Sequence, residues 1–418
     1  MSFERVGIRP ARILLPAPGV SRETWACIAC DQYTSEPEYW EKAYAFAGDA
    51  PSALRLILPE VNLKKSAELI PGIHAAMADY LREGLLVPAV DPGFVLCERT
   101  VPSGTRLGLV CAVDLEQYSF EKGSLPLVRP TEQTIASRLP PRLVIRRGAP
   151  VELTHIMILI DDPERTVLEP LQAKKDSLRK LYDFDLMMGG GHLKGWAVDR
   201  PEDLDQVDAS LNRLLDSLGA DPLLLAVGDG NHSLATAAKA YWNELKEGIS
   251  EKERENHPAR FALCEIVNIH DNALLFEPIH RLVTGTGAGA LLADWQAYAR
   301  QRGMDLDAGE GHAFTLVSAE GDRTVTVGNP EGAIPCETIQ KFLDDFLSRH
   351  PEAEIDYIHG EASLRNLARE PGAVGFLLPD IDKNSFFSDV KKLGVLPRKT
   401  FSMGEADEKR FYMEAREI

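Results

Sequence analysis

The sequence lacks any apolar run long enough to span a membrane, and it is poor in basic residues. A membrane-spanning helix needs about 20 mostly apolar residues, and no stretch approaches this length. The opening MSFERVGIRP lacks the apolar core of a secretion signal. Lysine and arginine total 46 against 64 acidic residues, so the formal net charge is −18. Such a surface repels phosphate backbones. We therefore expect a cytoplasmic protein without membrane or nucleic-acid partners.

Cysteine is also scarce, with six residues in 418. Cys27 and Cys30 have Cys-X-X-Cys spacing, but one such pair is half of a zinc site and no second pair follows. A redox role would need a βαβ setting that the surrounding sequence does not suggest. We interpret the two residues as small apolar side chains one helical turn apart, reduced in a cytosol.

Several catalytic signatures are missing. The sequence has no His-X-X-X-His with an intervening Glu, no Gly-X-Ser-X-Gly and no protein-kinase signature set. It matches neither the P-loop nor the dinucleotide fingerprint. These absences argue against a metalloprotease, an α/β-hydrolase and a protein kinase.

Apolar runs with strand character alternate with helical patterns along the chain. We expect an α/β or α+β fold, with a mixed sheet flanked by helices. Glycines cluster at 285–289, which suggests a boundary between a main lobe, residues 1–284, and a C-terminal α/β lobe, residues 285–418.

Local patterns predict individual elements. GFVLCERTV and RLGLVCAVDLEQY flank the turn PSGT and predict a hairpin. Residues 64–84 predict a helix interrupted by Pro71, and residues 201–219 predict an amphipathic helix. Further helices are expected over 172–182 and from Pro130, with Glu132 in the first turn of the latter.

The stretch LLLAVGDGNHSLATA carries the main candidate site. Its apolar residues suit a buried strand, and Gly228 and Gly230 permit a sharp turn into a helix. Asp229 is a candidate metal ligand or base, and His232 is a candidate phosphate donor or proton shuttle. The same residues are also typical of a simple tight turn, so the pattern alone leaves both interpretations open.

The chain resembles domain-of-unknown-function family 1015. The resemblance rests on the order of several motifs: GLVCAVDLEQY, RPTEQT, HIMILIDD, GDGNHSLATA, LLFEPIHRLV and GVLPRKTFSM. Members typically carry Asp-Gly-His-His-Arg after a buried strand. This sequence departs from that pattern at Asn231, Ser233 and Ala235. Losing the arginine removes a fork that would grip a phosphate with two hydrogen bonds.

The Asp-Gly-X-His element is also similar to the motif of ParB/sulfiredoxin-like domains. Some of these bind nucleotides, and some are free-serine kinases in which the loop cradles phosphate and a separate acidic residue is the base. The resemblance implies a ligand-binding loop formed by Gly228, Gly230, Asn231 and Ser233.

Two further motifs supply candidate ligand-binding groups. VRPTEQT contains Arg129 and Glu132, and the resemblance makes Glu132 the candidate general base. EPIHRLV contains His280 and Arg281, which suit an anionic substrate. Each also has a structural interpretation, as a helix-dipole carboxylate or as a strand-end salt bridge.

Other histidines are harder to interpret. GGGHLKGW places His192 on a glycine loop that suits either a lid over a ligand or a surface hairpin. His155 lies in ELTHIMILI, where alternation does not decide which way it faces.

The leading hypothesis is phosphoryl transfer from a nucleotide to a small hydroxyl compound. Asp229 would hold Mg²⁺, the 228–233 loop would hold phosphate, and Glu132 would take the acceptor's proton. The alternative is a non-enzymatic ligand sensor or scaffold that uses the same pocket after loss of catalytic residues.

Overall fold

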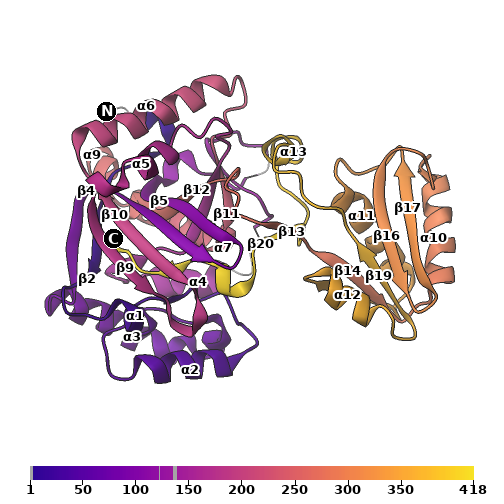
Figure 1. Ribbon diagram of the computed structural model, residues 1–418, viewed down its shortest axis with the longest axis horizontal. Helices are drawn as coiled ribbons and strands as arrows, with labels where there is room; N and C mark the ends of the chain where they lie inside the picture. Colours follow the sequence, from indigo (N-terminus) through magenta and orange to yellow (C-terminus); the bar gives the residue numbers. More distant parts are fainter. Residues whose placement is uncertain (1–2, 122, 135–138) are drawn as a thin grey trace. The chain divides into compact units, whose positions relative to one another are not determined.

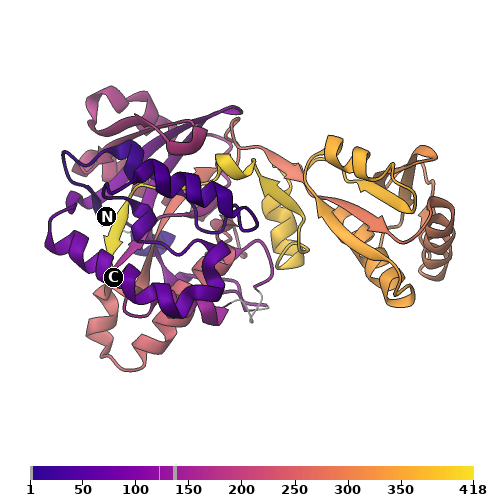
Figure 2. The same cartoon turned by 90° about the horizontal axis from the view of Figure 1, so that it is seen from below.

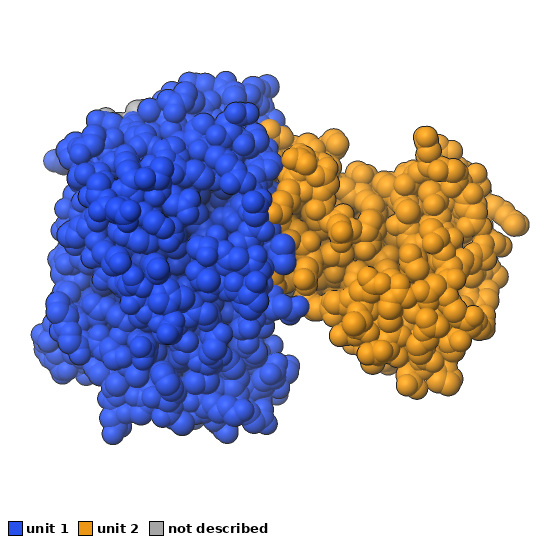
Figure 3. Space-filling view, viewed as in Figure 1, with its two compact units in different colours: residues 1–275, 405–418 blue, residues 276–404 orange. Residues whose placement is uncertain are grey.

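The chain folds into two compact units in the computed structural model, which describes residues 3–121, 123–134 and 139–418. Unit 1 comprises Met1–Leu275 and Glu405–Ile418, and unit 2 comprises Phe276–Gly404 (Figure 3). Unit 2 thus begins before the glycine cluster expected to mark the boundary, and the last residues of the chain return to unit 1. Among the described residues, no helix is both long and apolar enough to cross a membrane.

Unit 1 is built around one large sheet with helices on both sides (Figure 1). Its strands are β1 (Ile8–Arg9), β2 (Ala11–Pro16), β3 (Cys27–Ile28), β4 (Leu86–Val101), β5 (Gly104–Asp114), β6 (Val128–Pro130), β7 (Val151–Leu153), β8 (Ile156–Ile160), β9 (Arg179–Asp185), β10 (His192–Val198), β11 (Leu225–Asp229), β12 (Phe261–Asn268), β21 (Phe411–Tyr412) and β22 (Ala415–Glu417). Its helices are α1 (Arg22–Trp25), α2 (Pro37–Ala47), α3 (Ser66–Arg82), α4 (Leu139–Arg146), α5 (Glu169–Ala173), α6 (Pro201–Ser217), α7 (Asn231–Ser233), α8 (Tyr241–Lys246) and α9 (Glu251–Asn256).

The sheet is mixed, as expected from the sequence. Its main path runs β6-β11-β8-β12-β5-β4-β2-β22-β7, and β1, β9 and β10 join it from the side. Strand β11 is parallel to β6 and antiparallel to β8, while β12 is parallel to β8. The predicted hairpin is β4–β5, with Val101 opposite Gly104 at the turn. The mixed α/β fold class is confirmed.

Both faces of this sheet are apolar. Successive side chains of a strand point to opposite faces, and apolar residues occupy consecutive positions. On β4, Phe94 and Leu96 join one buried cluster, while Val95 and Cys97 join the other. Helix α6 covers the first face, and α1, α2 and α3 cover the second. A sheet covered on both faces explains why its strands read as nearly continuous apolar runs.

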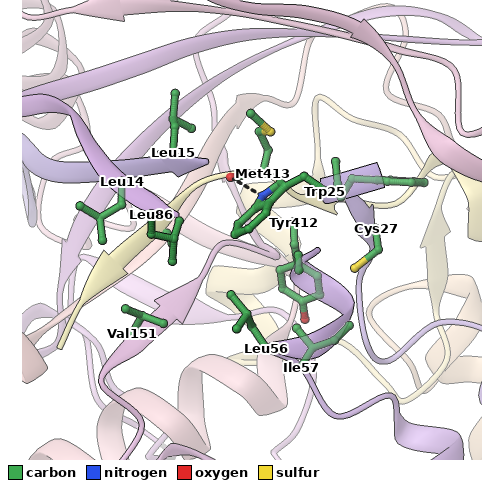
Figure 4. Close-up of a cluster of buried hydrophobic side chains, with 14 of the residues drawn as sticks. Leu14, Leu15, Trp25, Cys27, Leu56, Ile57, Leu86, Val151, Tyr412 and Met413 are labelled. Atoms are coloured by element: carbon green, nitrogen blue, oxygen red, sulfur yellow. Dashed lines mark hydrogen bonds between the residues drawn. The ribbon is translucent and has the colours of Figure 1, made fainter. Parts of the chain in front are cut away.

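The C-terminal segment, residues 405–418, runs through the interior of unit 1 rather than along its surface. β21 pairs with β3, and β22 pairs with both β2 and β7. Figure 2 shows the yellow C-terminal strand lying among the indigo and purple elements from the first part of the chain. The indole N–H of Trp25 donates to the Met413 carbonyl over 3.2 Å, between the apolar side chains drawn in Figure 4. The segment therefore joins elements from the first half of the chain.

This segment also brings buried charges into unit 1. Arg410 is 2% exposed and lies 2.7 Å from Glu265, and it also pairs with Glu414. Burial lowers the pKa of Arg410, but these two carboxylates more than offset that effect and raise it above its ordinary value. Arg416 donates to Glu152 over 2.6 Å. Buried charges without such partners would be strongly destabilising.

Unit 2 has its own six-stranded sheet, in the order β15-β17-β16-β19-β14-β18, and a separate two-stranded ribbon of β13 and β20. Helices α10 and α11 pack on one face of the larger sheet and α12 on the other. The elements are β13 (Phe276–Pro278), β14 (His280–Thr284), α10 (Ala288–Gln301), β15 (Asp305–Leu306), β16 (His312–Ser318), β17 (Gly321–Gly328), α11 (Pro335–Arg349), β18 (Glu354–Ile358), α12 (Glu361–Leu367), β19 (Ala373–Leu377), α13 (Phe386–Leu393) and β20 (Phe401–Met403).

Three predicted elements differ from the structure. Helix α3 continues through Pro71 without a break. Residues 179–182, the end of the helix expected over 172–182, belong to strand β9, because pairing with β10 outweighs local helical preference. The helix expected from Pro130 is wrong over 130–134: Pro130 ends β6, beside β11, and Glu132 is not in a helical turn. The rest of that expected helix, 135–138, lies outside the described residues.

The buried ion pairs of the C-terminal segment predict a large stability effect. We expect Arg410→Met to lower the free energy of unfolding of unit 1 by about 3–5 kcal/mol, because Glu265 and Glu414 would stay buried without their cation. Urea unfolding followed by tryptophan fluorescence measures this. The matched control is Arg82→Met, at a side chain 67% exposed, with an expected loss below about 1 kcal/mol. Equal losses for the two variants would contradict the prediction.

Candidate functional site

The Gly-Asp-Gly-Asn-His loop joins β11 to a run of helical turns. Asp229 ends the strand, and the pairing with β8 shifts register between Val227 and Asp229, around Gly228. Gly230 has φ +81°, and a Cβ there would lie 3.0 Å from a side-chain carbon of Ile156. Both the backbone angle and the close contact require glycine. The turn thus fixes the direction in which Asp229 points.

Asn231 braces this loop against the segment after β6. Its side-chain oxygen accepts the Thr131 N–H over 3.0 Å, and its amide nitrogen donates to the Val227 carbonyl over 3.3 Å. The Thr131 hydroxyl also donates to Val227, over 2.6 Å. The RPTEQT motif therefore lies beside the loop, as the sequence hypothesis requires. The Asn231 amide, however, uses these hydrogen bonds to stabilise the loop against the segment after β6.

The carboxylate of Asp229 lies in an unusual electrostatic environment. Its side chain is 24% exposed; one oxygen accepts the Gly230 N–H over 2.9 Å, and the other lies 3.9 Å from the Lys409 ammonium. Burial raises the pKa of Asp229, Lys409 opposes this, and the negative charge of Asp31 reinforces it. The net direction is upward. Two carboxylates and one ammonium thus share a poorly hydrated region.

Next to this region, three polar side chains form a hydrogen-bonded chain. His155 Nδ1 lies 3.0 Å from the Tyr412 hydroxyl, and His155 Nε2 lies 2.9 Å from Ser233 Oγ. The Cys30 N–H donates to the Tyr412 oxygen over 3.2 Å. If Tyr412 donates its proton to Nδ1, then Nε2 carries the ring proton and donates to Ser233. The Ser233 hydroxyl proton then remains available to a further acceptor.

These three side chains line one part of a cavity of about 140 Å³ in unit 1. Most of its wall is aliphatic. Two ion pairs, Glu60–Arg142 and Glu152–Arg146, complete it. Burial raises the pKa of Glu60 above its ordinary value even though Arg142 opposes that shift. The aliphatic lining residues are Leu56, Ile57, Leu58, Leu63, Met77, Ile145, Ala149, Val151, Leu153 and Ile418.

The other residues predicted near the loop have mixed placements. Arg129 is buried, donates to the Pro126 carbonyl and pairs with Asp221, so its guanidinium is held by the protein. Glu132 is half-buried and directly follows Thr131, which is bonded to the loop. His232 is half-buried within α7. The roles assigned to Glu132 and His232 remain predictions.

His280 and Arg281 belong to unit 2 and hold that unit together. Arg281 is fully buried, and it donates to the carbonyls of Ile279 and Lys399 and to Cys336 Sγ. His280 Nδ1 accepts the Leu378 N–H over 3.2 Å. Both side chains are therefore engaged inside unit 2, by backbone contacts rather than by the strand-end salt bridge considered from the sequence.

The cysteine pair has the environment of unreactive thiols. Cys27 is buried in β3, and Cys30 lines the cavity. Burial raises the pKa of Cys30 to about 12, and nearby Asp31 acts in the same direction. A thiol with a raised pKa is a poor nucleophile and a poor metal ligand. All six cysteines are free thiols.

Comparison with known proteins identifies the family. A family model described as "Protein of unknown function (DUF1015)" matches residues 8–346. The chain belongs to this family. The match excludes residues 405–418, which supply Lys409 and Tyr412 to the site. A search of curated proteins finds no match.

Solved structures give distant similarities. A free serine kinase in complex with AMP is 12% identical, with a TM-score of 0.38, over 73% of this chain and 90% of the other. A conserved hypothetical protein from Pyrococcus furiosus is 13% identical, with a TM-score of 0.36, over 74% and 94%. SbnI from Staphylococcus aureus, truncated at its C-terminus, is 9% identical, with a TM-score of 0.36, over 71% and 83%. These values are too low to transfer an activity to this chain.

Sequence reasoning did not find Lys409, Tyr412, Glu60 or Arg142. The first two lie within the last stretch of the chain, which lacks a helical period and in which two adjacent aromatic residues follow a run of charged ones. That mixture of charges and aromatic side chains in a non-helical stretch was the available signal. No local pattern, however, says which distant strand such a segment will join.

The raised pKa of Asp229 predicts a stability change. A carboxyl whose folded pKa is raised favours folding below its unfolded pKa, and this contribution is lost as pH rises through the folded pKa. We therefore expect Asp229→Asn to raise the free energy of unfolding by about 0.5–2 kcal/mol at neutral pH, with a gain that shrinks toward about pH 4. Urea unfolding across this pH range measures it. The exposed control, Asp49→Asn, should change little; a destabilised Asp229→Asn would refute the prediction.

His192 provides a second pH-dependent test, away from the site. It starts β10 after the glycine loop, and its two ring nitrogens lie 2.6 Å from Asp185 and 2.7 Å from Asp183. Burial lowers the pKa of His192, but the hydrogen bonds to the two aspartates outweigh this and raise it. Hydrogen bonds from Lys180 and His192 lower the pKa of Asp183 to about 2.

A raised histidine pKa stabilises the fold below the unfolded pKa, about 6.5, and the contribution disappears as pH rises through the folded pKa. We expect His192→Gln to destabilise unit 1 by less than about 1 kcal/mol at acidic pH, since the group is partly exposed. At alkaline pH the variant should match the wild type. Urea unfolding at both pH values tests this, and a loss that is larger at alkaline pH would contradict it.

Proposed function

We propose that unit 1 binds a nucleotide and transfers a phosphoryl group to a small hydroxyl compound. The observation that carries the proposal is the half-buried carboxylate of Asp229, on a glycine-bounded turn, 3.9 Å from the Lys409 ammonium and under the influence of the Asp31 charge. Phosphoryl transfer depends mainly on positioning and on charges that stabilise the transferring group. A rigid turn and an adjacent ammonium supply both.

Lys409 replaces, in this proposal, the arginine that the loop lacks. Its side chain is only 11% exposed, so its charge acts in a region of reduced dielectric constant. An ammonium is a point charge and not a fork, which lowers geometric specificity but still attracts a phosphate oxygen. Ser233 remains a hydroxyl donor at the same turn.

Asp229 and Asp31 would hold the Mg²⁺ that accompanies a nucleotide. Within the described ranges, no group of three or more His, Cys, Asp or Glu side chains is arranged to hold a metal ion. Mg²⁺ commonly uses one or two carboxylates together with substrate phosphates and water, so two aspartates fit this ion. Burial is the main cause of the raised pKa of Asp229 and repulsion by Asp31 adds to it; a cation would relieve that repulsion. Bound there, Mg²⁺ would neutralise charge on the phosphates.

The transfer breaks the bond between the terminal phosphorus of the nucleotide and its bridging oxygen, and it forms a bond from that phosphorus to the acceptor oxygen. The acceptor's hydroxyl proton passes to Glu132 in this proposal. The choice of Glu132 for this role is supported by the hydrogen bond that joins its neighbour Thr131 to Asn231 of the loop.

A specific observation also favours a second function, a non-enzymatic ligand sensor. The Asn231 amide is committed to Thr131 and Val227, and Ser233 is bonded to His155. Two of the loop's polar side chains are therefore already hydrogen-bonded to other residues of the protein. A sensor would be stabilised by its ligand without turning it over.

Thermal unfolding with ATP, ADP, CTP and GTP, each with and without Mg²⁺, tests the proposal. A bound nucleotide raises the unfolding temperature by mass action. We expect a Mg²⁺-dependent shift with at least one nucleotide, and its loss in Lys409→Met. The control is Lys246→Met, at a lysine that pairs with Glu116 away from the loop and should leave the shift unchanged.

Phosphorus NMR on the same samples, with hydroxyl compounds added, separates the enzyme from the sensor. We expect a phosphate ester to form with the wild type and its rate to fall at least about 100-fold in Glu132→Gln. A nucleotide shift without any product would favour the sensor. No shift with any nucleotide, or an equal shift in Lys409→Met, would overturn the proposed function.

A further inference from the structure

A second pocket of unit 1 lies where its large sheet splits. Strands β4 and β5 form a hairpin, but their pairing ends at Val95 and Val110. From there β4 pairs with β2, while β5 pairs with β1, where Arg9 lies opposite Ala112. Pro10 joins β1 to β2 across the split. The pocket at this point has a volume of about 580 Å³, which suits a small organic molecule.

The wall of this pocket combines apolar and cationic side chains. Three arginines, one glutamate and one asparagine form the polar part of the wall. This local excess of arginine contrasts with the net charge of −18 of the whole chain. A cationic pocket on an acidic protein favours an anionic ligand. The apolar part is formed by proline rings and alanine methyl groups, those of Pro10, Ala11, Pro92, Ala112 and Pro258.

Arg9 is the arginine of this pocket that lacks a carboxylate partner. It is half-buried, and its guanidinium carbon lies 3.4 Å from the centre of the Phe261 ring. Its Nη1 lies 3.4 Å from the Asn256 amide oxygen, whereas its Nε and Nη2 are accessible and donate to no group within the described ranges. Stacking on the ring holds the guanidinium plane and leaves this edge open. Two N–H groups on one edge suit the two oxygens of a carboxylate or a phosphate.

The charges around Arg9 leave room for an anion. Burial lowers the pKa of Arg9, the positive charge of Arg416 lowers it further, and Asp114 opposes them only in part. Asp114 itself accepts two hydrogen bonds from Arg260, over 2.9 and 2.6 Å, so it is already neutralised. An anion bound between Arg9 and Arg416 would relieve the repulsion between these two cations.

The other two arginines of the pocket have carboxylate partners, but the total does not balance. Arg12 lies 3.2 Å from Asp91 and 2.6 Å from Glu417. Arg416 pairs with Glu152, and a further arginine shares that carboxylate. With Arg9, four guanidinium groups therefore face three carboxylates. The Nη1 of Arg416 is accessible and makes no hydrogen bond to any part of the chain that the structure describes.

We propose that this pocket binds a small organic anion, whose carboxylate or phosphate group engages Arg9 and Arg416 and whose apolar body lies on the proline and alanine side chains. The pocket shares no lining residue with the turn at Asp229, and the proposal does not rest on the proposed function. Because Arg416 belongs to the C-terminal segment, the bound anion would also help to hold that segment in unit 1.

Titration calorimetry with 1-naphthyl phosphate and with 1-naphthoate tests this inference, and the tighter of the two identifies the anionic group. We expect Arg9→Met to bind at least about tenfold more weakly, because it removes the unpaired charge. Methionine keeps an apolar stem against Phe261, and loss of a cation that Arg416 repels should leave the fold intact. The matched control is Arg302→Met in unit 2, another arginine stacked on an aromatic ring, 3.8 Å from the centre of Tyr298. It should bind like the wild type.

A second variant tests the missing carboxylate without removing a cation. Asn256 is exposed, so Asn256→Asp should fold and place a carboxylate beside the Arg9 guanidinium. This carboxylate would compete with the ligand, so we expect binding at least about tenfold weaker and an unfolding temperature no lower than that of the wild type. The control is Asn212→Asp, since Asn212 also accepts a hydrogen bond from an arginine, Arg5, outside the pocket. It should leave binding unchanged.

Two further measurements define the site. The neutral 1-naphthol should bind more weakly than either anion, and Lys409→Met should bind 1-naphthyl phosphate like the wild type, which separates this pocket from the loop. Undetectable binding of both anions, equal binding of 1-naphthol, or wild-type affinity in Arg9→Met and Asn256→Asp would overturn the inference.

Discussion

The ion pair of Arg410 with Glu265 and Glu414 is the interaction on which the rest of unit 1 depends. It fixes the C-terminal segment inside the unit, where strands β21 and β22 complete pairings with β2, β3 and β7. A buried guanidinium between two carboxylates has one favourable position, because any displacement leaves charge unpaired in a region of low dielectric constant. The segment is thereby held in register as well as in place.

The same segment builds the candidate site. Lys409 and Tyr412 flank the anchored Arg410 and Phe411, and they reach Asp229 and His155 respectively. The site thus combines a glycine-bounded turn from the middle of the chain with side chains from its end. The site places two carboxylates near one ammonium and a histidine between two hydroxyls. This arrangement exists only when the turn and the C-terminal segment are both in place. In the proposed function, stability and ligand binding are therefore coupled through this segment.

Local sequence patterns were sufficient for elements whose stability is local. The β4–β5 hairpin follows from its turn residues, and α6 follows from its amphipathic pattern and the glycine after it. They were insufficient where distant pairing decides. The residues of β9 favour a helix locally, but they form a strand because they pair with β10. The segment before Glu132 is a strand because β6 pairs with β11.

The site shows the same division. The Asp229 turn was predictable because Gly230 must adopt a positive φ, and such a requirement is visible in the sequence. Lys409 and Tyr412 were not, since their role depends on a return of the chain over more than 170 residues. Arg281 lies in a motif that suits an anionic ligand, yet in the structure its guanidinium donates hydrogen bonds to carbonyl groups inside unit 2. Burial and partners, which decide such roles, are three-dimensional properties.

Hydrogen exchange with and without nucleotide and Mg²⁺ can show whether the turn and the C-terminal segment act as one site. If the turn and the C-terminal segment form one phosphate-binding site, amides of residues 228–233 and of residues 405–414 should gain protection together when the nucleotide is added. Protection of the turn alone, or of neither segment while the nucleotide is bound elsewhere, would contradict the account.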